Sequence, residues 1–158
     1  MNPSTSNAEP MAQLEIRKGA DSRLEVGGLR FVACRREVDV IDGGITLYVH
    51  SALPGDEREL LRFDLFRNRP HYHAPAANDK ETKIAAASDV TEWGIEQLTA
   101  RAAELVREGG FHELPSRLDL ESIRKSGPAL RELLDGLAEP TEISHFPIPA
   151  ARLAELKG

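Results

Sequence analysis

Residues 61–73, with the sequence LRFDLFRNRPHYH, bring one aspartate, three arginines and two histidines into a short stretch. His71 and His73 are two positions apart, so in a β-strand both side chains project from the same face. If the chain turns tightly before His71, the preceding strand returns Asp64 and Arg62 to that face. The spacing therefore predicts a polar cluster of Arg62, Asp64, His71 and His73 on one side of a sheet.

A neighbouring strand extends this polar surface. Residues 45–50 alternate between apolar and polar side chains, and Tyr48 and His50 are on the polar side. Pairing Tyr48 with Arg62 keeps the two apolar faces together and brings His50 to the same surface, near Leu60. The candidate ligand-binding residues are therefore Arg62, Arg69, His50 and Tyr48.

Two kinds of chemistry suit these residue types. Two or three imidazoles with a carboxylate form a ligand set for a divalent transition metal such as zinc, iron, nickel or manganese. His71, His73 and Asp64 are its candidate ligands, and with water in an open position the centre would be either a metal-binding module or a hydrolase. Alternatively, the same three residues are catalytic without a metal: a histidine acts as general acid or base while Arg62 and Arg69 hold a phosphate, as in metal-free ribonuclease chemistry. A third interpretation is structural, with the carboxylate simply paired to arginine.

The elements that must position this cluster follow from hydrophobic periodicity. Alternation with period two predicts strands in short runs from Leu24 to Val40, then at 45–50, 59–67 and 71–73, with a short edge strand around Lys83–Ala87. The glycines of Asp42-Gly43-Gly44 suit a tight hairpin turn. We expect an antiparallel meander of four or five strands.

Helical patterns dominate the second half of the chain. Asp89 and Glu92 have capping-box spacing before an apolar stripe, which predicts one long helix from Thr91 to Glu108. Shorter helices are expected at 119–125 and 128–137. The predicted fold class is α+β, with the long helix packed on one face of the sheet and the shorter C-terminal helices beside it. The predicted organisation is a disordered lead-in (1–13), a single domain (14–137), and a proline-rich linker with a short tail helix from Ala150 to Leu156 (138–158).

Composition narrows the classes of partner. The chain has 158 residues and a formal net charge of −6, which disfavours RNA and anionic membranes as partners, although the local basic stretch 62–73 suits a small anion. No apolar run approaches the ~20 residues of a membrane helix and residues 1–13 lack an export signal, so we expect a cytoplasmic protein. The single cysteine, Cys34, excludes an intramolecular disulfide and multi-cysteine metal clusters. An exposed edge strand would allow a homodimer.

Three short motifs carry a family resemblance. Arg62-Phe63-Asp64, then Pro70-His71-Tyr72-His73, then a helix opened by Glu92-Trp93, resembles an uncharacterised family of small bacterial domains with R-F-D and P-H-Y-H signatures. The resemblance covers about residues 45–112 and implies no activity. The same order of motifs is also similar to one class of small toxins from bacterial toxin–antitoxin pairs, which implies an RNA-directed action. Here Leu65 follows Asp64, where a polar residue is typical of that class.

These observations leave several functions open. The first is a polar sheet face that binds a small anionic ligand or a metal ion through Arg62, Asp64, His71 and His73, with hydrolysis of a phosphoester as its reaction. The second is a non-enzymatic interaction module whose acidic helical half and proline-rich tail engage a protein partner. The third is a toxin-like, RNA-cleaving component of a toxin–antitoxin pair. The sequence alone does not decide whether the chain is an enzyme.

Overall fold

An antiparallel β-sheet of eight strands is the centre of the computed structural model, which describes residues 9–78, 80–85 and 89–158. The strands are β1 (Met11–Lys18), β2 (Ser22–Val26), β3 (Leu29–Val38), β4 (Asp42–Ser51), β5 (Glu59–Phe66), β6 (His71–His73), β7 (Thr82–Lys83) and β8 (Glu142–Pro149). Their spatial order is β7-β6-β5-β4-β3-β1-β8, and β2 also pairs with β3. The expected α+β class with an antiparallel sheet is confirmed, but the sheet is larger than four or five strands. Part of the expected edge strand 83–87 lies outside the described residues.

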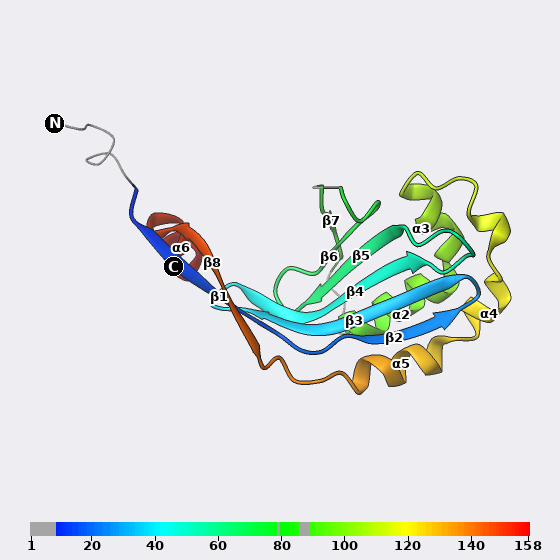
Figure 1. The fold of residues 1–158 in the computed structure, drawn as a ribbon, viewed down its shortest axis with the longest axis horizontal. Coiled ribbons are helices and arrows are strands. Elements are labelled where there is room, and N and C mark those ends of the chain that lie inside the picture. Colours follow the sequence, from blue (N-terminus) through cyan, green and yellow to red (C-terminus); the bar gives the residue numbers. More distant parts are fainter. Residues whose placement is uncertain (1–8, 79, 86–88) are drawn as a thin grey trace.

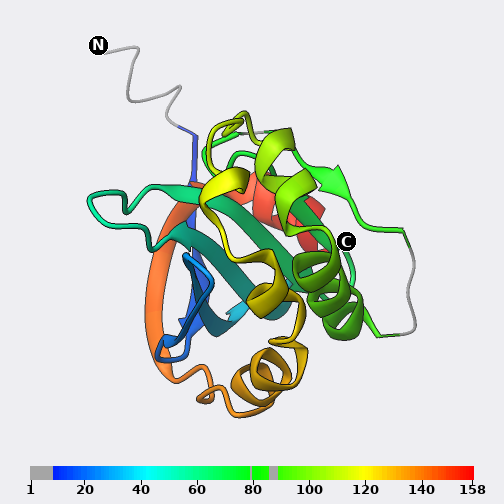
Figure 2. The ribbon, with the colours of Figure 1, turned by 90° about the vertical axis from the view of Figure 1, so that its right-hand side faces the viewer.

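One face of this sheet is covered by helices. They are α2 (Val90–Ala100), α3 (Ala102–Glu108), α4 (Leu120–Arg124) and α5 (Gly127–Asp135), with the 3₁₀ turn η1 (Pro115–Arg117) between α3 and α4. Helices α2 and α3 contact β5, α5 contacts β2 and β3, and α4 packs on α2 and α3 (Figures 1 and 2). The core between the sheet and the helices is formed by every second residue of the strands together with apolar residues of the helices. Its members include Phe31, Leu47, Phe63, Ile95, Leu98 and Leu130. Side chains on the opposite face of β4, β5 and β6 are therefore free to be polar.

The predicted long helix is divided in two. Asp89 caps α2 by accepting a hydrogen bond from the Glu92 amide at 3.0 Å, so the expected start of the helix is confirmed. Arg101 leaves the helical region, with φ −124° and ψ 27°, and separates α2 from α3. Its side chain bonds Gln97 behind it and Glu104 ahead of it, so both helix ends have a polar partner at the break.

The hairpin between β3 and β4 turns earlier than expected. Its tip is at Asp39, Val40 and Ile41, where Val40 takes a φ of 58°, whereas Gly43 and Gly44 lie inside β4. A Cβ on Gly44 would lie 2.5 Å from the Leu65 carbonyl oxygen, so this glycine lets β5 approach β4 closely. The prediction of a turn at Asp42-Gly43-Gly44 was wrong because these glycines serve strand packing.

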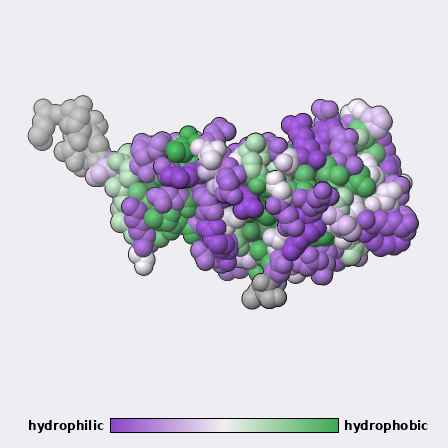
Figure 3. Space-filling view, turned by 90° about the horizontal axis from the view of Figure 1, so that it is seen from below, coloured by the Kyte–Doolittle hydropathy of each residue, from purple (hydrophilic) through white to green (hydrophobic). Residues whose placement is uncertain are grey.

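The two ends of the chain pair with each other. Strand β8 pairs with β1 from Lys18–Glu142 to Met11–Pro149, so the segment expected to be a linker is largely a strand. Residues 11–13, expected to be disordered, belong to β1, while residues 1–8 lie outside the described residues. The tail helix is present as α6 (Ala150–Lys157) and contacts β1 and β8 (Figure 1). Figure 3 shows hydrophobic residues on this end of the molecule, where Met11, Ile143 and Phe146 are exposed.

No helix of the described residues is long and apolar enough to cross a membrane.

Candidate functional site

Strand pairing assembles two polar rows on the face of the sheet that the helices leave free. Tyr48 pairs with Arg62, as expected, and Arg62 pairs with His73. One step along the strands, Thr46 pairs with Asp64 and Asp64 with His71. Directly paired residues in antiparallel strands have their Cβ atoms about 4.5–5.5 Å apart. The register therefore brings the predicted cluster together.

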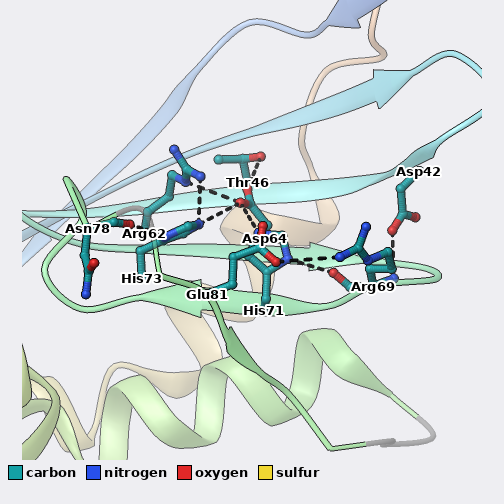
Figure 4. Close-up of polar contacts among 9 residues, drawn as sticks. All are labelled: Asp42, Thr46, Arg62, Asp64, Arg69, His71, His73, Asn78 and Glu81. Carbon is teal, nitrogen blue, oxygen red and sulfur yellow. Dashed lines mark hydrogen bonds and ion pairs between the residues drawn. The ribbon is translucent and has the colours of Figure 1, made fainter. Parts of the chain in front are cut away.

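Asp64 is at the centre of this cluster and is only 3% exposed. The buried hydroxyl of Thr46 donates a hydrogen bond to Asp64 Oδ1 at 2.9 Å. The other carboxylate oxygen, Oδ2, lies 3.0 Å from His71 Nε2 and 4.0 Å from His73 Nε2 (Figure 4). Thr46 thus fixes the carboxylate so that Oδ2 faces both imidazoles.

Both imidazoles are oriented by backbone carbonyl groups. His71 Nδ1 lies 2.8 Å from the Arg69 carbonyl oxygen, and His73 Nδ1 lies 2.6 Å from the Asn78 carbonyl oxygen. A carbonyl oxygen only accepts, so each Nδ1 must carry the proton. In a neutral imidazole this leaves the Nε2 lone pair as an acceptor, and both Nε2 atoms point toward Asp64 Oδ2.

Three acceptor atoms therefore converge on one small space. The ligand atoms of Asp64, His71 and His73 all lie within 4.8 Å of one another. Acceptors at this distance repel each other unless a cation lies among them, whether a proton, a guanidinium or a metal ion. Arg62 Nη2 donates to His73 Nε2 at 2.8 Å, and Arg62 Nε lies 3.3 Å from Asp64 Oδ2. The guanidinium is thus one cation within the cluster.

A second carboxylate borders the cluster on the side of His71. Glu81 Oε1 lies 3.5 Å from His71 Nε2, and its other oxygen lies 3.9 Å from Arg69 Nη2. Beside them is a cavity of about 210 Å³, lined by Asn68, Arg69, Pro70, His71, Glu81, Lys83 and Ile84. Phe66 closes the neighbouring side with its ring 6.2 Å from the His71 ring. Glu81 and the partly exposed Arg62 thus border the cluster on two sides.

The other predicted ligand-binding residues take different places. The Arg69 side chain is 70% exposed, and the residue contributes its carbonyl group to His71. A β-bulge between Val49 and His50 pairs His50 with Glu59, one residue from Leu60, near which we expected it. The ring centroid of His50 is 6.3 Å from that of Tyr48, and both residues line a separate cavity of about 300 Å³. Tyr48 remains the cross-strand neighbour of Arg62, and burial raises the pKa of its hydroxyl.

Sequence reasoning missed the residues that hold the cluster in place. Thr46 could have been found, because pairing Tyr48 with Arg62 also pairs Thr46 with Asp64. Glu81 and the carbonyl of Asn78 belong to the segment between β6 and β7, whose path no local motif determines. The buried carboxylate of Asp42 accepts hydrogen bonds from the amides of Asn68 and Arg69 and so fixes the turn before His71. These contacts depend on tertiary structure.

Residues 23–134 match the model of a protein family described as a domain of unknown function (DUF7700). The match includes every residue of the cluster. It confirms the expected kind of family, an uncharacterised one, and reaches beyond residues 45–112 in both directions. No curated protein and no solved structure matches the chain.

Proposed function

The chain belongs to the DUF7700 family of domains of unknown function, and we propose that in this chain the domain binds one divalent transition-metal ion through Asp64, His71 and His73. One observation carries the proposal. One polar atom of each side chain is already held: Asp64 Oδ1 by the Thr46 hydroxyl, and the Nδ1 atoms of His71 and His73 by backbone carbonyl groups. The other polar atom of each side chain therefore faces a common centre. Metal-binding histidines in proteins are oriented in this way, by donating the second ring N–H to a carboxylate or carbonyl oxygen.

The distances support a single small ion. Ligand bonds to zinc are about 2.0–2.2 Å long, so ligand atoms around a tetrahedral ion lie roughly 3.4 Å apart. Asp64 Oδ2 is 3.0 Å from His71 Nε2 and 4.0 Å from His73 Nε2, close to that spacing. All three ligand atoms lie within 4.8 Å of one another, so binding of an ion requires Arg62 to release Nε2 and His73 to approach the other two ligands.

The ligand types favour zinc, iron(II) or a similar ion over calcium or magnesium, because imidazole nitrogen is a poor ligand for the last two. Three protein ligands leave at least one coordination position for water. A bound dication lowers the pKa of that water and generates a nucleophile near neutral pH. The reaction class that we propose is therefore hydrolysis, with a phosphoester as the substrate that suits the surrounding arginines.

Metal content and metal affinity test the proposal. Full-length protein should bind one equivalent of Co²⁺ or Zn²⁺ in calorimetric titrations, and the Co²⁺ complex should show the visible absorption of a four- or five-coordinate ion. Asp64→Asn, and the double variant His71→Ala, His73→Ala, should each lose at least about 100-fold in affinity. His112→Ala removes an exposed histidine outside the cluster and serves as the matched control, with unchanged binding expected.

Because Asp64 and His73 are buried, their replacement can disturb the fold. Circular dichroism must therefore establish that the variants are folded before their affinities are compared. Equal metal affinity in the wild type and both cluster variants would refute the proposed site.

The position of Arg62 favours a second candidate function, metal-free binding of a small anion. In the absence of metal the guanidinium already satisfies His73, and a proton on His71 Nε2 would satisfy Asp64 Oδ2. Arg62, His71 and the neighbouring Arg69 would then form a cationic site for a phosphate or carboxylate. Phosphate binding that is independent of metal and lost in Arg62→Met would select this function.

A further inference from the structure

We propose that the metal centre also takes a tetrahedral oxyanion of the phosphate type, and that Arg62 makes metal and oxyanion bind cooperatively by moving from His73 to the oxyanion. The inference rests on the proposed metal site and deepens it. Its basis is that Arg62 occupies the lone pair that the metal needs and is the cross-strand neighbour of Tyr48, which lines a cavity with two basic side chains.

Arg62 is weakly attached to its present position. Within the described part of the chain its guanidinium makes one hydrogen bond, from Nη2 to His73 Nε2. Its Nε atom is shielded from solvent and lies 3.3 Å from Asp64 Oδ2 but makes no hydrogen bond there. The side chain is 30% exposed, so it has solvent on one side. Moving the guanidinium away from His73 therefore breaks one hydrogen bond and weakens one ion pair with Asp64, whose positive charge a metal dication would replace.

The free face of the sheet offers a place for the oxyanion next to Arg62. A cavity of about 290 Å³ opens there, and its lining includes Lys18, Arg36, Thr46 and Tyr48. Tyr48 is the cross-strand neighbour of Arg62 and lines the cavity together with Arg36. Thr46 bonds Asp64, so the cavity adjoins the metal ligands directly.

The charges around this space favour an anion. The lining residues of the cavity include two basic side chains, Lys18 and Arg36, and one carboxylate, Glu142. Lys18 is paired with Asp21 at 3.1 Å. With Arg62 and a metal dication added, the positive charges still outnumber the carboxylates of Asp21, Asp64 and Glu142. Guanidinium groups match the oxygens of phosphate with paired hydrogen bonds, and a divalent ion binds phosphate oxygen well. A doubly charged tetrahedral oxyanion fits this environment better than a neutral molecule.

Cooperativity follows from the shared use of Arg62. The metal must displace Arg62 from His73, and an oxyanion held in the cavity that Tyr48 lines draws the guanidinium away from His73 as well. Whichever ligand binds first breaks that hydrogen bond, so the second binds without this penalty. Because such coupling is reciprocal, each ligand should raise the affinity of the other by the same factor, about 10- to 100-fold.

Calorimetric titration of the full chain with Co²⁺, with and without phenyl phosphate, tests this inference. Phenyl phosphate should raise Co²⁺ affinity at least about 10-fold, whereas acetate, a planar anion with one charge, should change it far less. Arg62→Met should bind Co²⁺ as tightly as the wild type or more tightly, because the competing cation is gone, and should lose most of the coupling. Arg36→Met should weaken phenyl phosphate binding and leave Co²⁺ binding alone unchanged.

The outcomes separate this inference from the metal site itself. Co²⁺ binding that is unaffected by phenyl phosphate would overturn the inference and leave the metal site intact. Full coupling in Arg62→Met would overturn the role of Arg62. Equal stimulation by acetate would overturn the tetrahedral selectivity. Absence of Co²⁺ binding to Asp64 and the two histidines would overturn the metal site and the inference together.

Discussion

Thr46 determines which way the Asp64 carboxylate faces. The threonine side chain is fully buried, and its hydroxyl donates to Asp64 Oδ1 at 2.9 Å. Without this bond the carboxylate could rotate, and Oδ2 would no longer be held against His71 and His73. Partners of this kind are important for metal affinity because they orient the ligands before the metal arrives.

We therefore predict that Thr46→Val, which keeps the shape of the side chain and removes its hydroxyl, lowers Co²⁺ affinity about 10- to 100-fold. The loss of one hydrogen bond to a buried carboxylate should also lower the free energy of unfolding by about 1–3 kcal/mol. Calorimetry and urea unfolding measure the two effects. Thr46→Ser retains the hydroxyl and should restore most of the metal affinity. Unchanged affinity in Thr46→Val would show that the carboxylate is oriented by other contacts.

The part of the site that depends on side-chain alternation could be predicted from the sequence. Two-residue periodicity placed His71 and His73 on one face, and the pairing of Tyr48 with Arg62 was correct because it keeps the apolar faces together. The carbonyl groups of Arg69 and Asn78 could not be predicted. Every residue has a carbonyl, so its role depends on the path of the loop and has no signature in residue type.

At the level of secondary-structure elements, the turn between β5 and β6 is stabilised by a residue that lies outside the turn. The Asp42 carboxylate, at the start of β4, accepts from the amides of Gly43, Asn68 and Arg69. Asp42 is 6% exposed, and its carboxylate is the acceptor for all three N–H groups. The turn in its present form positions the Arg69 carbonyl that orients His71.

Asp42→Ala should accordingly lower the free energy of unfolding by about 1–3 kcal/mol, because it removes one buried acceptor that bonds three amides. It should also reduce metal affinity, although Asp42 does not contact the cluster, since His71 would lose its fixed orientation. Urea unfolding and Co²⁺ titration measure the two effects. Asp39→Ala, at an exposed position of the neighbouring hairpin, is the matched control. A loss of stability with unchanged metal affinity would show that the turn does not orient His71.

Elements made of local contacts were predicted better than elements that pair over long distances. The capped start of α2 was correct because Asp89 and Glu92 are three residues apart. Strands β1 and β8 were missed because they pair with each other from opposite ends of the chain. Pro147 and Pro149 suggest a linker, but an edge strand accepts proline where the missing N–H would face solvent. The local pattern therefore carried no information about this pairing.

For the molecule as a whole, buried or half-buried acidic groups of raised pKa lie on both faces of the sheet. Burial raises the pKa of Tyr48 on the polar face and of Tyr72 on the helical face. The Tyr72 hydroxyl also donates to Glu108 Oε1 at 2.8 Å, which favours its protonated form and links β6 to α3. Burial also raises the pKa of the Cys34 thiol. All three groups therefore hold their protons more tightly in the folded chain than in the unfolded chain.

This difference determines how the free energy of unfolding changes at alkaline pH. A group that binds its proton more tightly when folded stabilises the fold below its ordinary pKa, and this contribution is lost as pH rises above that value. The free energy of unfolding should thus be flat near pH 8 and should fall from about pH 9 upward, first through Cys34 and then, above about pH 10, through the tyrosines.

Urea unfolding between pH 8 and 11 measures the slope, while tyrosinate absorbance at 295 nm should show both native tyrosines ionising above their ordinary range. The double variant Tyr48→Phe, Tyr72→Phe should reduce the slope above pH 10 and leave the Cys34 step. A slope above pH 10 that is equal in both proteins would mean that other groups, such as Lys18, whose pKa is raised by its hydrogen bond to Asp21, control alkaline stability.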